Sequence, residues 1–159
     1  MSLIIEDGSI VAGSNSYAST ADLELYAGRI GHTLKTNKLE LLFRAMQYVE
    51  GLDFIGSKFT KDQSLQWPRS SVRIDGFYIT ESEIPRKLID LQLSVAVSID
   101  KDVDPLAVQE RVASSETVGP ITVQYEAGTA AQATSPTIRA YEAGLVRGGG
   151  GLSVKLTRA

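Results

Sequence analysis

Hydrophobic periodicity divides this chain into two unequal parts. Apolar residues recur at helical spacing up to about residue 101, whereas the remainder is charged, rich in small residues and interrupted by Pro105 and a run of four glycines at 148–151. We therefore predict an N-terminal extended segment over 1–18, a helical core domain over 19–101 and an extended C-terminal arm over 102–159. The expected fold class is mainly α: a small helical bundle with a long ordered loop and an extended C-terminal arm that contains short β-strands.

Three helices are predicted in the core. Ser19 or Thr20 opens the first, with Asp22 placed for a capping box, and Gly31 ends it. The second begins at a Thr36 cap, and the third begins at Glu81 or Ser82 and runs to Asp100 or Lys101. Their expected core stripes are Leu23, Tyr26, Ala27 and Ile30, then Leu39, Leu42, Phe43, Met46 and Val49, then Leu88, Leu91, Val95 and Ile99.

The segments between and after these helices lack helical period. Residues 53–80 are predicted to form an ordered loop. Ile121, Val123 and Tyr125 alternate with polar residues, which predicts a short strand, and Ser135-Pro136 predicts the start of a short helix that continues through Leu145. Leu152, Val154 and Leu156 alternate in the same way and predict a final strand.

Composition excludes several classes of protein. The chain has no cysteine and one histidine, so disulfide scaffolds, thiolate metal sites and sites built on two histidines are excluded. Sixteen basic and 19 acidic residues give a net charge of −3, which does not favour nucleic-acid binding. No run approaches the roughly 18 apolar residues of a membrane span. We expect no metal, no cofactor, no membrane association and no enzymatic activity.

Individual candidate sites have simple structural interpretations. His32 follows a helix end and is interpreted as a surface or C-cap residue. Asp100, Asp102 and Asp104 alternate, but the glycine and glutamate of a calcium-binding loop are missing, so they are interpreted as a solvated helix end. The glycine run lacks the Lys-Ser/Thr of a phosphate-binding loop, and Ser70 and Ser71 lack a nucleophile elbow.

Aromatic residues in the long loop allow two interpretations. They either pin the loop to the helices or form a platform on which nucleic-acid bases stack. Pinning is the favoured interpretation, because basic residues do not concentrate around them. The residues concerned are Phe54, Phe59, Trp67, Phe77 and Tyr78.

A series of short motifs resembles a known family. In chain order they are Ser16-Tyr17-Ala18-Ser19, Tyr26, Ala45, Tyr48-Val49, Asp53-Phe54-Ile55-Gly56, the run from Gln63 to Trp67-Pro68-Arg69, Gly76, Ile84-Pro85 and Val118-Gly119-Pro120-Ile121. Over about residues 14–156 the chain resembles the tailed-phage head–tail connector or adaptor proteins, some of which are described as DnaT-like single-stranded-DNA-binding proteins. Trp67, Pro68 and Arg69 are expected to anchor the loop.

This resemblance implies a structural virion protein. Such an adaptor forms a ring on the portal protein, joins the capsid to the tail and lets DNA pass through a channel without binding it specifically. The implied partners are the portal, a tail-side neck or tail-completion protein and further copies of the chain, about 12 in a ring. The implied location is the neck of the virion, after synthesis in the host cytoplasm. The alternative is a DnaT-like single-stranded-DNA-binding replication module.

Partner docking is assigned to the end of the C-terminal arm. A strand of this length is not stable alone, so it pairs either with Ile121–Tyr125 of its own chain or with a sheet edge on the portal or a neighbouring subunit. In the second case the expected docking residues are Arg147, Leu152, Val154, Leu156 and Arg158.

Overall fold

The computed structural model describes residues 2–106, 115–118, 121–124 and 135–147. In these residues the helices are α1 (Thr20–Arg29), α2 (Lys38–Glu50), α3 (Arg86–Asp100) and α4 (Pro136–Glu142). The strands are β1 (Ser57–Lys58), β2 (Arg69–Ser70), β3 (Val72–Ile74), β4 (Phe77–Ile79), β5 (Ser115–Val118) and β6 (Ile121–Gln124). They pair as three separate antiparallel ribbons, β1–β2, β3–β4 and β5–β6.

Helix caps follow the signals in the sequence. Ser19 and Asp22 form a full capping box at the start of α1, and the Ser135 side chain caps α4 with Pro136 in its first turn. The cap of α2 is Asn37 rather than the predicted Thr36, because the Asn37 side chain accepts from the Leu39 amide. Helix α3 starts after Pro85, without a side-chain cap.

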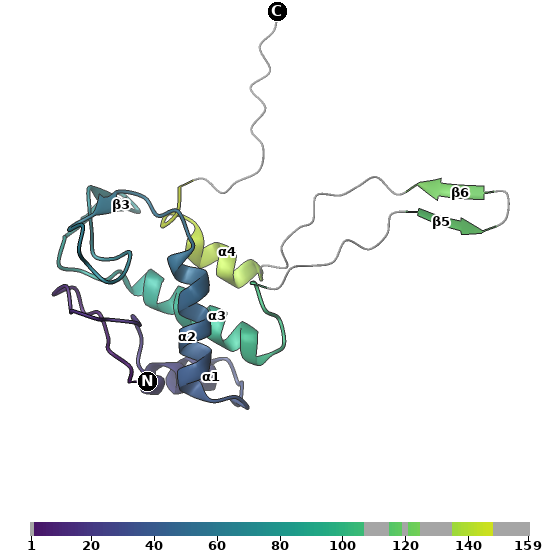
Figure 1. Cartoon of the computed structure of the whole chain (residues 1–159), viewed down its shortest axis with the longest axis horizontal. Coiled ribbons are helices and arrows are strands. Elements are labelled where there is room, and N and C mark those ends of the chain that lie inside the picture. Colours follow the sequence, from purple (N-terminus) through teal and green to yellow (C-terminus); the bar gives the residue numbers. More distant parts are fainter. Residues whose placement is uncertain (1, 107–114, 119–120, 125–134, 148–159) are drawn as a thin grey trace, which may run out of the picture.

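The core lies where α2 crosses α3, with α1 and α4 against α3 (Figure 1). Leu41, Leu42, Leu88 and Leu91 are fully buried there. Ile30 was expected in the core stripe of the first helix, but 49% of it is exposed. Ile138 of α4 and Leu145 are buried in the same core as α2 and α3, so residues 135–147 contribute to it.

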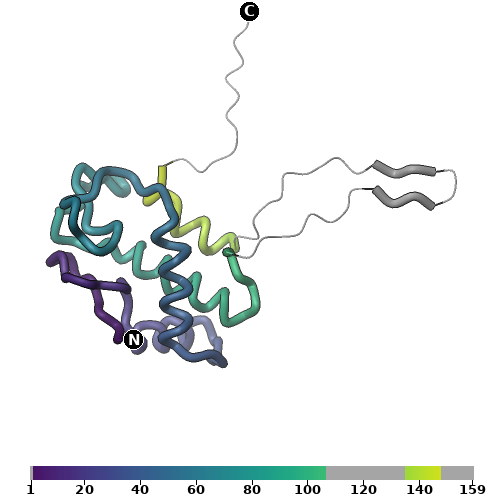
Figure 2. Tube along the Cα trace, viewed as in Figure 1, coloured from purple at the N-terminus to yellow at the C-terminus, as the bar shows by residue number. Residues whose placement is uncertain are grey.

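Segment 2–18 is tied into the molecule by polar contacts. The buried Glu6 carboxylate accepts hydrogen bonds from the amides of Gly8, Ile10 and Val11 and from the Ser14 hydroxyl. The Gly13 amide donates to Ser64 Oγ at 2.9 Å, which places this segment beside the 53–80 region (Figure 2).

The predicted fold class is wrong. The molecule is a small mixed domain, not a helical bundle with a β-containing arm, because residues 53–80 carry four of the strands and no helix. These strands are only two or three residues long, so they leave no period in the sequence. The predicted short strand at 121–125 is found as β6, paired with β5, whereas the predicted strand at 152–156 lies outside the described residues.

Candidate nucleic-acid interface

The loop aromatics divide into a buried pair and an exposed group. Phe54 and Trp67 are 1% and 0% exposed and pack edge to face with their ring centroids 5.9 Å apart. Phe59 is 48% exposed, Phe77 76% and Tyr78 74%. Pinning therefore explains the first two residues but not the other three.

Phe77 and Tyr78 stand on a tight hairpin formed by β3 and β4. Asp75 and Gly76 join the two strands, and both have positive φ, at 51° and 89°. Positive φ at both central residues is the pattern of a type I′ turn, whose twist matches that of paired strands. We call residues 72–79 the aromatic hairpin.

The register of the aromatic hairpin assigns its side chains to two faces. Val72 pairs with Ile79 and Ile74 with Phe77, so these four share one face, while Arg73 and Tyr78 share the other. Val72 is fully buried and anchors the first face to the core. Phe77 lies on that face at the turn end of the ribbon and is exposed there.

Arg73 makes two contacts within the aromatic hairpin, one of them with Tyr78 on the face that the two residues share. Its guanidinium lies over the Tyr78 ring, 4.6 Å from the centroid, and Nη2 donates to the Gly76 carbonyl at 3.0 Å. Among the described residues Arg73 forms no salt bridge, and neither do the exposed Lys58 and Lys61 of the same loop. Their positive charges are therefore available to an anion.

Arg69 holds the base of the hairpin. Its guanidinium donates to the carbonyls of Phe54, Ile55, Gly56 and Gln66, which are main-chain groups of the loop itself. Burial, and to a lesser degree the charge of Arg147, lowers the pKa of Arg69 from its usual value. Arg69 therefore cross-links the two halves of the loop. Strand β3 begins shortly after it, immediately following Ser71.

A second polar cluster joins the loop to α2. Glu50 accepts hydrogen bonds from the Tyr17 hydroxyl at 2.8 Å and from the Gln66 amide, and the Tyr17 hydroxyl accepts from the Trp67 amide. Burial raises the pKa of Glu50, although these hydrogen bonds act in the opposite direction. The hairpin thus rises from a fixed base at the end of α2, and α1 lies at the opposite end of that helix (Figure 1).

The chain matches a known protein family over its whole length. A family described as "Putative DnaT-like ssDNA binding protein" matches residues 1–159. The chain belongs to this family. No curated protein and no solved structure matches it.

Membership of this DnaT-like family corrects the predicted identity. The DnaT-like part of the resemblance is confirmed, but the prediction of a bacteriophage head–tail connector is wrong, because the matching family is described by single-stranded-DNA binding. Trp67 and Arg69 carried much of that resemblance, and they are buried residues that hold the loop. Buried residues indicate which fold a chain adopts, but they do not indicate which partner it binds. Portal binding, ring formation, virion location and the lack of enzymatic activity are untested and stay predictions.

The predicted docking residues fall largely outside the described residues. Leu152, Val154, Leu156 and Arg158 all lie there. Arg147 is described: its amide donates to the Asp53 carbonyl at 2.7 Å and its Nη2 to the Gly56 carbonyl at 2.8 Å. It therefore contacts the loop of its own chain, close to the residues that Arg69 binds.

His32 and Asp100 form a contact that the sequence did not predict. His32 Nε2 lies 2.7 Å from Asp100 Oδ2, and the amides of Lys35 and Thr36 donate to the same carboxylate. The Asp100 side chain is buried, so its interpretation as part of a solvated helix end is wrong. Asp104 instead pairs with Arg44. Within the described residues no cluster of acidic or histidine side chains could hold a metal ion.

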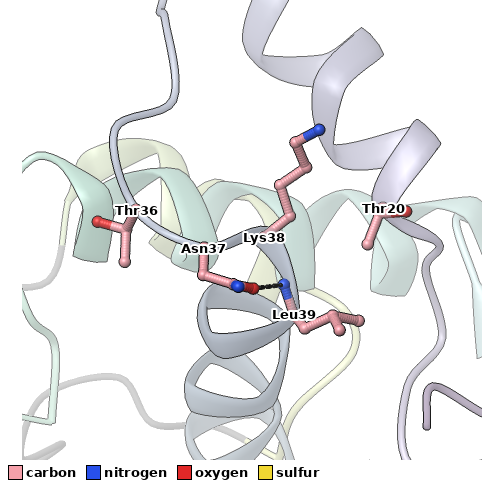
Figure 3. A pocket seen from close by; sticks show the side chains of 5 residues that line it. All are labelled: Thr20, Thr36, Asn37, Lys38 and Leu39. Carbon is pink, nitrogen blue, oxygen red and sulfur yellow. Dashed lines mark hydrogen bonds between the residues drawn. The ribbon is translucent and has the colours of Figure 1, made fainter.

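Two clefts lie among the helices, away from the aromatic hairpin. One of about 360 Å³ lies at the start of α2 and is lined by Thr20, Thr36, Asn37, Lys38 and Leu39 (Figure 3). Two of its polar side chains already have partners, since Asn37 caps α2 and Lys38 pairs with Glu24. The other, of about 440 Å³, lies between α1, α3 and the start of α4. None of the helices in the described portion of the chain is long and apolar enough to cross a membrane.

Proposed function

We propose that this protein binds single-stranded DNA through the aromatic hairpin. The family description supports this activity, and it was the alternative interpretation of the sequence. Nothing in the described residues favours a second function.

One observation carries the proposal: two consecutive aromatic side chains, Phe77 and Tyr78, are about three-quarters exposed on a tight hairpin. Proteins that bind single strands without strong sequence preference stack bases on such rings, and each stacked base contributes about 1–3 kcal/mol. Because every base has an aromatic face, all four bases can make this contact.

Charge on the same segment supports the backbone contacts that such binding requires. Arg73, Lys58 and Lys61 are exposed, and Lys58 directly precedes the half-exposed Phe59. Interleaved basic and aromatic residues are typical of single-strand binding surfaces. With only a few such cations and a net charge of −3, we expect modest affinity that falls with salt.

Fluorescence anisotropy with a labelled oligothymidine at low salt tests the proposal. Tyr78→Ala should weaken binding by about 5- to 150-fold, which corresponds to the loss of one stacked base. Leu25→Ala is the matched control, because Leu25 is an apolar side chain of α1 that is 62% exposed. Its affinity should equal that of the wild type. No binding by the wild type, or equal binding by Tyr78→Ala, would contradict the proposal.

A further inference from the structure

The two exposed rings of the aromatic hairpin point to opposite sides of the ribbon. Phe77 is paired with Ile74 and Tyr78 with Arg73, and neighbouring residues of a strand alternate between faces. Backbone of the hairpin therefore lies between the two rings.

Bases of a free single strand stack on one another as a continuous column. Such a column can place its end on one ring, but it cannot reach both sides of a ribbon while its bases stay in contact. A strand that uses both Phe77 and Tyr78 must therefore unstack a pair of its bases around the turn at Asp75–Gly76.

We propose that the aromatic hairpin separates two nearby bases of the bound strand, one stacking at Phe77 and the other on the Tyr78–Arg73 face. This inference rests on the proposed function and adds its substrate class: weakly stacked, thymine-rich single strands. Purine strands bind less well because their base–base stacking must first be broken, and stacking strength is a known source of pyrimidine preference.

Arg73 makes the two sides unequal. Its guanidinium covers one side of the Tyr78 ring and supplies positive charge on that face, whereas Phe77 shares its face with the apolar Ile74 and Ile79. The base at Tyr78 thus has a cation nearby for its phosphate, and the base at Phe77 is held by apolar contact alone. Loss of either ring leaves one stacking position, and a strand can then bind without separating its bases.

Two measurements on the full chain test this inference. The first compares the affinities for oligothymidine and oligodeoxyadenosine of about 12 nucleotides, a length within the usual site size. The second follows 2-aminopurine in a thymine strand, because the fluorescence of this base rises when it is unstacked. The wild type should prefer thymine on the order of tenfold, which is about 1.4 kcal/mol, and the 2-aminopurine signal should rise on binding.

Phe77→Ala gives the decisive comparison. It should weaken binding to thymine strands and bring the thymine-to-adenine ratio close to one, whereas Leu25→Ala should leave both the affinity and the ratio unchanged. Both side chains are exposed, so an unchanged melting temperature confirms that each variant is folded.

The possible outcomes separate this inference from the proposed function. Equal affinity of the wild type for the two strands, without a rise in fluorescence, would overturn the separation of bases and leave single-strand binding intact. Failure to bind either strand would overturn both. A thymine-to-adenine ratio unchanged in Phe77→Ala would show that the preference does not depend on separating bases between Phe77 and Tyr78, and it would also overturn the inference.

Discussion

Trp67 is important for the packing of the interior but indicates little about function. Its ring is fully buried against Phe54, and its Nε1 has no hydrogen-bond partner among the described residues. Its contribution to stability is therefore packing. Tyr78 is also an aromatic residue of the loop, but its side chain is exposed to solvent.

Truncation of Trp67 should destabilise the protein strongly. We expect Trp67→Ala to lose about 3–5 kcal/mol of unfolding free energy, because it leaves a large cavity. Trp67→Phe should lose much less, since an aromatic ring is kept and no hydrogen bond is removed. Urea unfolding measures both variants, and a Trp67→Ala midpoint equal to that of the wild type would contradict this account.

Asp100 should make the free energy of unfolding decrease at acidic pH. Burial alone would raise the pKa of this carboxyl, but hydrogen bonds from Thr36, His32 and the Lys35 amide outweigh it and hold the pKa well below the ordinary value of 3.8. A lowered folded-state pKa adds stability that is fully present above pH about 4 and is lost as the pH falls through the folded value.

The variant that tests this is Asp100→Asn. It should be less stable than the wild type at neutral pH, and its stability should fall less steeply between pH 4 and pH 2. Thermal melts across that range measure the slope. Identical slopes would mean that other carboxyl groups cause the acid sensitivity.

At the scale of elements, the aromatic hairpin depends on close packing of Gly56 against Ser70 and Val72, where the hairpin begins. Gly56 has φ of +71°, and a Cβ there would lie 2.4 Å from the Ser70 carbonyl oxygen and 2.6 Å from Val72 Cγ2. Ser70 ends β2 and Val72 begins β3, so a side chain at Gly56 would push against the root of the hairpin.

Gly56→Ala should therefore cost about 1–3 kcal/mol in unfolding free energy, as overpacking usually does, and it should weaken DNA binding as well. Gly28→Ala is the control, because Gly28 lies in α1 with open space where a Cβ would be added, and alanine favours a helix by about 0.5–1 kcal/mol relative to glycine. If Gly56→Ala were as stable as the wild type, the packing at the hairpin root would be looser than described.

Element by element, the sequence predicted helices better than strands. Ser19 with Asp22 and Ser135 with Pro136 are local signals, and the structure keeps both caps. The strands of the loop depend on distant contacts, such as those of Arg69 with three carbonyls of residues 54–56, and no local pattern reports these. One local signal was missed: Asp75-Gly76 between alternating residues is a strong hairpin signal.

The candidate site could be predicted only incompletely. Aromatic residues in the loop were recognised as a possible stacking platform, but their type does not reveal which of them are exposed. Phe54 and Phe77 are identical residues, but Phe54 is buried against Trp67 and under the Arg69 guanidinium, whereas Phe77 is exposed. Favouring loop pinning for the whole set was therefore wrong for Phe59, Phe77 and Tyr78.

At the scale of the whole molecule, a helical core carries the aromatic hairpin, which we propose as the binding element, at one end. The core lies where α1, α2, α3 and α4 meet. The aromatic hairpin adds the buried Val72 to it, and the half-buried Ile74 and Ile79 pack against it. Exposed residues of the hairpin can therefore change without loss of the fold.

Salt dependence follows from the charges on that element. If Arg73, Lys58 and Lys61 each neutralise one phosphate, log K should fall against log salt with a slope of about −2, because each contact with a single strand contributes about −0.7. Arg73→Gln should reduce the slope by about 0.7. Anisotropy titrations at several salt concentrations measure both, and a slope near zero would exclude phosphate contacts.

The most direct test of the central claim is to locate the DNA on the protein. Backbone amide chemical shifts of the full chain are recorded while oligothymidine is added. We expect the largest changes in residues 72–79, smaller ones near Lys58 and Phe59, and little change in α1. Largest changes on the helices, or no change at saturating oligothymidine, would contradict this expectation.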